Sequence, residues 1–198
     1  MPKIVVKGTT INIPTSGGEP IGITTGPDGN IWFTEAYGNK IGKFGTCTSV
    51  SSSNNNGLQA SSSNNESSTT STNENSSSNT CNPEKITEFD LPKIIVRPGV
   101  FLESSAPYGI TAGPDCSVWF TELNPFANKI GRISPSGEIT EFTLPTPNSP
   151  PWDITAGPDG DLWFTGGATG IGKITPNGVI TEFPLPEYTS AINLTIGP

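Results

Sequence analysis

The side chains that could do chemistry in this chain are carboxylates and thiols, because it contains 18 aspartate and glutamate residues, three cysteines and no histidine. The absence of histidine removes the commonest general base and the commonest neutral metal ligand. A serine–histidine–aspartate or cysteine–histidine nucleophile therefore cannot be assembled from this chain alone. Any bound metal would be held by oxygen ligands, which favours a hard cation such as Mg²⁺ or Ca²⁺.

The elements that must position these groups are repeated. The pattern Pro-x-x-Ile-Thr-x-Gly-Pro-Asp-x-x-x-Trp-Phe-Thr occurs at residues 20–34, 107–121 and 151–165. Trp119 and Trp163 are 44 residues apart, the length of one four-stranded propeller blade. Trp32 and Trp119 are 87 residues apart, and insertions in two loops of the first repeat account for the excess.

Each repeat predicts four short strands, which in the second repeat cover residues 110–112, 118–121, 129–133 and 139–142. Pro-Asp-Gly forms a tight turn between the first two strands; Cys116 replaces its glycine, which predicts mild backbone strain. A sheet this small cannot bury its apolar face alone, so neighbouring blades must stack with Trp32, Trp119 and Trp163 between them. A role for these tryptophans in stacking on a ligand is the less favoured alternative.

We therefore predict an all-β fold, a β-propeller of four-stranded antiparallel blades. The three complete blades cover about residues 20–92, 107–146 and 151–186. Residues 8–14 are expected to be a stray outer strand, and residues 191–198 a stray inner strand, of further blades. A segment of a larger propeller is expected, with two chains that complete one ring as the alternative, and the open edge strands predict self-association.

The larger insertion, about residues 45–84, consists mostly of serine, asparagine, threonine and glycine, so it is expected to be disordered. Cys47 and Cys81 lie near its two ends. The strands on either side of the insertion must pair, which brings these cysteines close together and predicts a disulfide. Two free thiols remain the alternative, because no secretory signal is visible at the N-terminus.

Charge and hydropathy exclude two classes of partner. The net charge is −8 and the ten lysine and arginine residues are scattered singly, so there is no basic footprint for nucleic acid. No apolar run approaches the roughly 18 residues of a membrane span. An extracellular or cell-surface location is favoured, although no signal peptide is visible in the sequence.

The repeat unit resembles the streptogramin B lyase (virginiamycin B lyase) family. The resemblance rests on Pro-x-Gly-Ile-Thr-Ala-Gly-Pro-Asp-Gly-x-Leu-Trp-Phe-Thr-Glu, followed by Asn-Lys-Ile-Gly-Arg-Ile and Ile-Thr-Glu-Phe-x-Leu-Pro, and covers residues 8–44 and 85–198. It implies a seven-bladed propeller, of which about half is present. It also implies a Mg²⁺-dependent elimination that opens the ester bond of a cyclic depsipeptide antibiotic.

The family pattern places a histidine base at the x of Pro-x-Gly-Ile, a position called the slot below. The slots hold Ile21, Tyr108 and Trp152, none of which accepts a proton near neutral pH. The resemblance implies metal-binding carboxylates before that proline and at the end of Trp-Phe-Thr-Glu. Only the first repeat keeps both carboxylates, as Glu19 and Glu35. The alternative is that Glu35 and Glu122 are simply the polar residues that usually end this strand of the repeat.

Three functions follow from these residues. The favoured one is a non-catalytic propeller that binds a small molecule or peptide at the central channel, with Tyr108 and Trp152 as candidate ligand contacts. Packing against neighbouring inner strands is the competing role for both aromatics. The others are a purely structural repeat array and a lyase whose base lies in blades absent from this chain.

Overall fold

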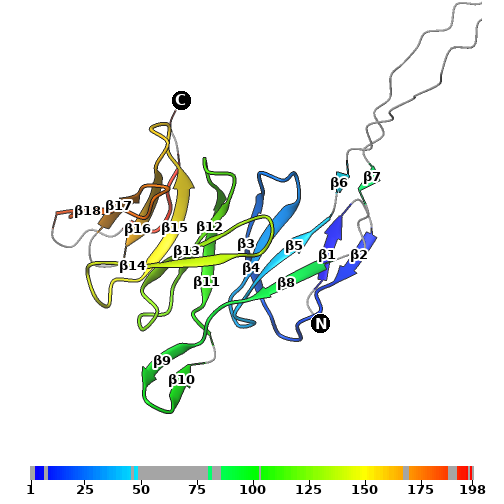
Figure 1. Ribbon diagram of the computed structural model, residues 1–198, viewed down its shortest axis with the longest axis horizontal. Coiled ribbons are helices and arrows are strands. Elements are labelled where there is room, and N and C mark those ends of the chain that lie inside the picture. Colours follow the sequence, from blue (N-terminus) through cyan, green and yellow to red (C-terminus); the bar gives the residue numbers. More distant parts are fainter. Residues whose placement is uncertain are drawn as a thin grey trace, which may run out of the picture.

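The computed structural model describes residues 3–6, 9–45, 47–48, 80–81, 86–102, 104–166, 170–186, 191–195 and 197. For residues 3–6, 9–11, 47–48, 80–81, 96 and 101–102 it describes the backbone alone. Three four-stranded antiparallel sheets stand side by side (Figure 1), which confirms the predicted all-β propeller class. No helix that could cross a membrane occurs among the described residues.

Each blade is a simple meander in which consecutive strands pair. The first strands of neighbouring blades contact each other and therefore form the inner edge of the array. The blades are β3 (Pro20–Thr25), β4 (Ile31–Glu35), β5 (Lys40–Phe44) and β8 (Ile86–Asp90); β11 (Pro107–Ala112), β12 (Val118–Glu122), β13 (Lys129–Ile133) and β14 (Ile139–Thr143); and β15 (Pro151–Ala156), β16 (Leu162–Gly166), β17 (Gly170–Ile174) and β18 (Ile180–Phe183).

The apolar core lies between the blades, as the repeat predicts. Trp32 is fully buried in a cluster with Ile110 and Val118 of the second blade, and Trp119 is fully buried against Ile154 of the third. Trp163 occupies the same position in the third blade but is only half-buried. Burial of these tryptophans therefore depends on the next blade, and it supplies the hydrophobic stabilisation that a single sheet lacks.

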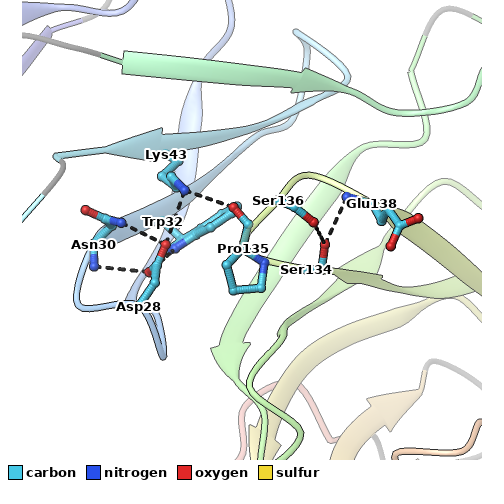
Figure 2. Close-up of polar contacts among 8 residues, drawn as sticks. All are labelled: Asp28, Asn30, Trp32, Lys43, Ser134, Pro135, Ser136 and Glu138. Carbon is cyan, nitrogen blue, oxygen red and sulfur yellow. Dashed lines mark hydrogen bonds and ion pairs between the residues drawn. The ribbon is translucent and has the colours of Figure 1, made fainter.

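Polar contacts fasten the outer part of each blade to the next (Figure 2). Lys43 forms an ion pair of 3.2 Å with Asp28 and donates a hydrogen bond of 3.0 Å to the carbonyl of Pro135 in the second blade. Asp28 also accepts a hydrogen bond from the indole of Trp32, 2.9 Å away. In the second blade, Arg132 donates to Pro176 of the third at 3.1 Å, so the contact repeats.

Three two-stranded hairpins accompany the blades. They are β1 (Lys3–Val6) with β2 (Thr9–Asn12), β6 (Cys47–Thr48) with β7 (Thr80–Cys81), and β9 (Ile94–Arg97) with β10 (Val100–Leu102). The predicted outer strand at residues 8–14 corresponds to β2, whose pairing with β1 the repeat did not predict. The β9–β10 hairpin is the second insertion and projects from the lower edge of the sheets in Figure 1.

The β6–β7 hairpin lies at the base of the large insertion. Its backbone register places Cys47 directly opposite Cys81. The predicted disordered segment falls mainly on residues 49–79 and 82–85, which lie outside the described residues, as do the side chains of both cysteines. The disulfide therefore stays a prediction. Cys116, the replaced turn glycine, has φ +58°, which confirms the expected strain.

Candidate functional site

Each inner strand carries a β-bulge at the slot. The register shifts between Pro20 and Ile23, between Pro107 and Ile110, and again between Pro151 and Ile154. A bulge takes residues out of the ladder and redirects their side chains, and bulges are frequent beside binding sites. The slot residues Ile21, Tyr108 and Trp152 all lie inside these bulges.

The freed backbone groups of the bulge are satisfied by the threonine of the second strand. Thr34 Oγ1 accepts from Gly22 N at 2.9 Å and donates to the carbonyl of Tyr108 in the next blade, also at 2.9 Å. Thr121 makes the same two bonds, to Gly109 N and to the carbonyl of Trp152. These repeated hydrogen bonds therefore connect the slot of each blade to the slot of the next blade.

A fourth slot appears at the C-terminal end of the described chain. Thr165 Oγ1 donates to the carbonyl of Ile192 at 3.0 Å, as its counterparts do to Tyr108 and Trp152. Leu194 N donates to Asp153 Oδ2 at 2.9 Å. The described residues 191–195 of the predicted inner strand are not assigned as a strand, but the hydrogen bonds of Ile192 and Leu194 place them beside the third blade. Ile192, 55% exposed, cannot act as a base either.

A pocket of about 400 Å³ opens between the first and second blades on the face that carries the second-to-third-strand loops. Among the residues that the structure describes, its lining includes one carboxylate, from Glu19, and no lysine or arginine. Two tyrosines contribute to it: Tyr37 is 75% exposed, and Tyr108 is half-buried. The lining also includes Ile21, Ser104 and Ala106.

Tyr108 thus lines the pocket, whereas Trp152 does not line it and contacts Tyr108 instead. The two rings meet edge to face, with centroids 6.0 Å apart and planes at 81°. Trp152 therefore supports Tyr108 from the side of the third blade. Both proposed roles, ligand contact and inner-strand packing, are compatible with the position of Tyr108.

One wall of the pocket is the strap formed by residues 104–106. Ser104 Oγ donates to the carbonyl of Ala36, and Ser104 O accepts from Asn124 Nδ2 at 2.9 Å. Ser105 N donates to Asn39 Oδ1 at 2.7 Å. The strap is therefore tied to the loops of both blades that enclose the pocket.

Glu19 and Glu35, the implied metal ligands, point to different environments. Glu19 is exposed, has φ +44° and lines the pocket; Ala106 has the same unusual backbone conformation, with φ +54°, at the equivalent position. Glu35 is fully buried, and a Cβ on Gly18 would collide with its Oε2. Among the described residues, no group of three histidine, cysteine or acidic side chains could hold a metal ion.

The carboxyl of Glu35 faces the fourth strand of its own blade. Both of its oxygens are buried without a hydrogen-bond partner. Glu88, by contrast, accepts from Thr15 N at 2.9 Å and Thr15 Oγ1 at 2.7 Å, and lies 3.5 Å from Lys40 Nζ. Burial, and then the charge of Glu88, raises the pKa of Glu35 to about 7.

The second blade repeats this buried carboxyl pair. Glu122 is 1% exposed, and Lys129 lies 2.6 Å from Glu141 Oε2. The Oε1 atoms of Glu122 and Glu141 are both buried without a partner. Burial, and then the charge of Glu141, raises the pKa of Glu122 to about 8. In the third blade Gly166 occupies the position equivalent to Glu122, so the pair is absent there.

Sequence reasoning missed the buried pairs, the strap and the fourth slot. The fourth-strand motif Ile-Thr-Glu-Phe was visible at residues 86–89, 139–142 and 180–183. Only the register of the sheets shows that its glutamate lies on the same face of the blade as the glutamate that ends the second strand. The slot at Ile192 could have been found, because residues 194–198 follow the pattern of residues 154–158.

Comparison with known proteins agrees with the fold and the repeats. The model of the virginiamycin B lyase family matches residues 10–197. The chain belongs to the virginiamycin B lyase family. A virginiamycin B lyase from Bordetella pertussis is 38% identical over 64 residues, which is 32% of this chain and 18% of that protein.

Two solved structures of this family are similar to most of the chain. A streptogramin B lyase is 34% identical with a TM-score of 0.62, covering 90% of this chain and 44% of its own. A selenomethionine-substituted virginiamycin B lyase from Staphylococcus aureus is 35% identical with a TM-score of 0.64, covering 91% and 46%. The chain therefore spans less than half the length of these relatives.

Proposed function

We propose that this chain is a ligand-binding scaffold of the virginiamycin B lyase family that does not itself catalyse ring opening. The observation that supports this most directly is the pocket at the slots of the first two blades, which retains a binding cavity around Ile21 and Tyr108. None of the four slots holds a side chain that can remove a proton near neutral pH. The pocket therefore favours binding without proton abstraction.

The chemistry of the lining favours an apolar ligand that carries a positive group. Two tyrosines and Ile21 supply apolar and aromatic surface, while the exposed carboxylate of Glu19 supplies the one charge among the described lining residues. A cation over an aromatic ring and beside a carboxylate gains from both. A small molecule or peptide with these features is the proposed ligand.

Titration of the protein with a streptogramin B depsipeptide that carries a basic amine tests the proposal, with binding followed by calorimetry. We expect saturable binding, and no ring opening when the depsipeptide is separated chromatographically afterwards. Tyr108→Ala should weaken binding roughly tenfold, because a buried aromatic contact contributes about 1.4 kcal/mol or more. Phe126→Ala is the matched control, since Phe126 is 63% exposed and does not line this pocket. Equal loss in both variants, or no binding at all, would reject the proposal.

The second candidate is one part of a Mg²⁺-dependent lyase whose base lies in other blades. Family membership and the two carboxylates Glu19 and Glu35 favour it. Glu35 has two unpartnered buried oxygens, but it lies behind Gly18 while Glu19 faces the pocket. The two carboxylates do not meet in one cavity, so we derive no step through the metal. Heat on titration with Mg²⁺ that disappears in Glu19→Gln would support this candidate.

A further inference from the structure

The threonine hydroxyls of the second strands belong to one continuous path of hydrogen bonds. The hydroxyl of Thr121 accepts from the amide of Gly109 at 2.8 Å and donates to the carbonyl of Trp152 at 2.9 Å. The hydroxyl of Thr34 donates to the carbonyl of Tyr108 at 2.9 Å. The carbonyl of Tyr108 and the amide of Gly109 belong to the same planar peptide unit. The bonds of Thr34 and Thr121 therefore meet on this one unit.

The path continues into the neighbouring slots without a change of direction. At one end, the amide of Gly22 donates to the hydroxyl of Thr34 at 2.9 Å. At the other end, the amide of Asp153 shares its peptide unit with the carbonyl of the third slot, and it donates to the hydroxyl of Thr165 at 3.0 Å. Thr165 in turn donates to the carbonyl of Ile192 at 3.0 Å. Since each hydroxyl has one proton, all six hydrogen bonds of this path, called the belt, point the same way from the first slot to the fourth.

The environment of the belt strengthens each of its hydrogen bonds. Thr34, Thr121 and Thr165 are all 0% exposed. A peptide unit that accepts a hydrogen bond at its oxygen becomes a better donor at its amide, and bonds aligned head to tail strengthen one another by about 10–30% each. The low dielectric constant of a buried site adds to this effect. Loss of one link therefore weakens the links on either side of it.

Two glycines let the slots approach one another closely enough for the belt to form. A Cβ atom on Gly22 would lie 2.4 Å from the carbonyl oxygen of Tyr108. A Cβ atom on Gly109 would lie 2.9 Å from the carbonyl oxygen of Trp152. Both distances are shorter than 3.0 Å, a separation that side chains do not adopt unless a neighbour moves. The carbonyl of each slot therefore packs directly against the backbone of the preceding slot.

Thr121 sets the relative position of the two aromatic slot residues. Its hydroxyl holds the peptide unit that follows Tyr108 on one side and the carbonyl of Trp152 on the other. The rings of these two residues meet edge to face, with centroids 6.0 Å apart. Tyr108 lines the pocket, whereas Thr121 does not. A change at Thr121 therefore reaches the pocket through the backbone and ring of Tyr108.

We propose that Thr121 is a positioning residue of the pocket, which holds the ring of Tyr108 in the orientation that the ligand contacts. The belt acts on Tyr108 from both sides. Thr34 fixes its carbonyl, and Thr121 fixes the amide that follows it together with the backbone of Trp152. The effect on ligand affinity rests on the proposed binding function. The coupling between the two threonines and the orientation of the ring can be measured without a ligand.

Nuclear magnetic resonance spectroscopy of the ligand-free protein tests the belt. We expect the hydroxyl protons of Thr34 and Thr121 to exchange slowly with water and to give separate signals. Thr121→Val should move the amide proton of Gly22 upfield, although Gly22 lies in another blade, because the bonds of Thr34 weaken. Thr34→Val should move the amide proton of Gly109 in the same direction. Thr121→Ser, which keeps the hydroxyl, and Thr143→Val, at an exposed site on an outer strand, should leave the Gly22 amide in place.

Two results would overturn the belt. The first is rapid exchange of both hydroxyl protons in the unmodified protein. The second is an unchanged Gly22 amide in Thr121→Val or, if that variant fails to fold, an unchanged Gly109 amide in Thr34→Val.

The ring of Tyr108 reports its own position in the same ligand-free samples. Its contact with the indole of Trp152 shifts the signals of the tyrosine ring through the ring current. Thr121→Val should change these shifts, and Thr121→Ser should restore them. Unchanged ring signals of Tyr108 in Thr121→Val would overturn the positioning role, whatever the amides show.

A double-mutant cycle then measures the effect on binding, with the streptogramin B depsipeptide that carries a basic amine. Thr121→Val should weaken binding about three- to tenfold when Tyr108 is present, within the range measured for coupled residues. It should have no further effect in Tyr108→Ala, which keeps the backbone carbonyl and so leaves the belt intact. Equal weakening in both backgrounds would overturn the positioning role. Absence of binding by the unmodified protein would instead reject the proposed ligand function, and the ring signals of Tyr108 would still decide whether Thr121 positions that residue.

Discussion

The hydroxyl of Thr121 on β12 donates a hydrogen bond to the carbonyl of Trp152 on β15, 2.9 Å away, and so ties the second blade to the slot of the third. The same hydroxyl accepts from Gly109 N at 2.8 Å, inside the bulge of its own inner strand. Thr34 and Thr165 repeat this arrangement in the other blades. These threonines do not line the pocket, but their hydrogen bonds hold the backbone of each slot residue.

Replacing Thr121 with valine tests this tie. The two side chains have nearly the same shape, but valine leaves Gly109 N and the carbonyl of Trp152 buried without partners. We expect a loss of about 1–3 kcal/mol in the free energy of unfolding, measured by urea denaturation. Thr121→Ser should keep most of the stability, because it retains the hydroxyl. Equal stability of the valine and serine variants would contradict the proposed role.

The turn between the first two strands offers a second prediction. Cys116 has φ +58°, whereas the equivalent residue of the third blade is Gly160, with φ +81°. Side chains other than glycine cost about 1 kcal/mol in this left-handed region. Cys116→Gly should therefore raise the thermal unfolding temperature by a few degrees, and Gly160→Ala should lower it by a similar amount. Shifts of the same sign in both variants would show that another effect dominates.

The repeat predicted most of the fold because each blade uses the same local signals. Pro-Asp-Gly turns and the 44-residue spacing were enough to place the strands of all three sheets. The predicted burial of Trp163 was too high, since that ring depends on a neighbour that follows it, and it is only half-buried. The pairing of β1 with β2 was also not predicted, because residues 3–6 do not match the repeat closely enough to signal a strand.

The site was less predictable, since it depends on which side chains meet across strands. Spacing alone suggested that Glu19 and Glu35 act together. The sheet instead places Glu35 on the same face as Glu88, whose charge acts on it, and Gly18 packs against the Glu35 carboxyl. The structure places Tyr108 in the lining of a pocket, and its contact with a ligand stays a prediction. The strap at residues 104–106 directly follows the β9–β10 hairpin, an insertion that no other repeat contains. Sequence periodicity carries no information about such unique segments.

The pairing of Cys47 with Cys81 across the β6–β7 ladder leads to a third prediction. Residues directly opposite each other in an antiparallel pair have a Cα separation of about 4.5–5.5 Å, which lies within the range of disulfides. We expect a non-reduced peptide digest to contain a Cys47–Cys81 cross-link. Closing the loop between them should stabilise the fold by roughly 3–4 kcal/mol on the chain-entropy model. Cys116, an exposed free thiol, is the internal control and should react with an alkylating reagent; alkylation of all three cysteines would exclude the bridge.

The buried carboxyls make the stability of the protein depend on pH. Burial raises the pKa of Glu35 to about 7 and that of Glu122 to about 8, both from an ordinary value of 4.5. Between pH 4.5 and pH 8 the folded chain therefore binds more protons at these groups than the unfolded chain, so their contribution to stability falls as pH rises. The urea midpoint should decrease from pH 5.5 to pH 8.5, and this decrease should be smaller in Glu122→Gln. Glu138→Gln should retain the full decrease, because its carboxyl is exposed. A urea midpoint that rises over this interval, or an identical pH dependence in the two variants, would show that Glu122 is already ionised in the folded protein at neutral pH.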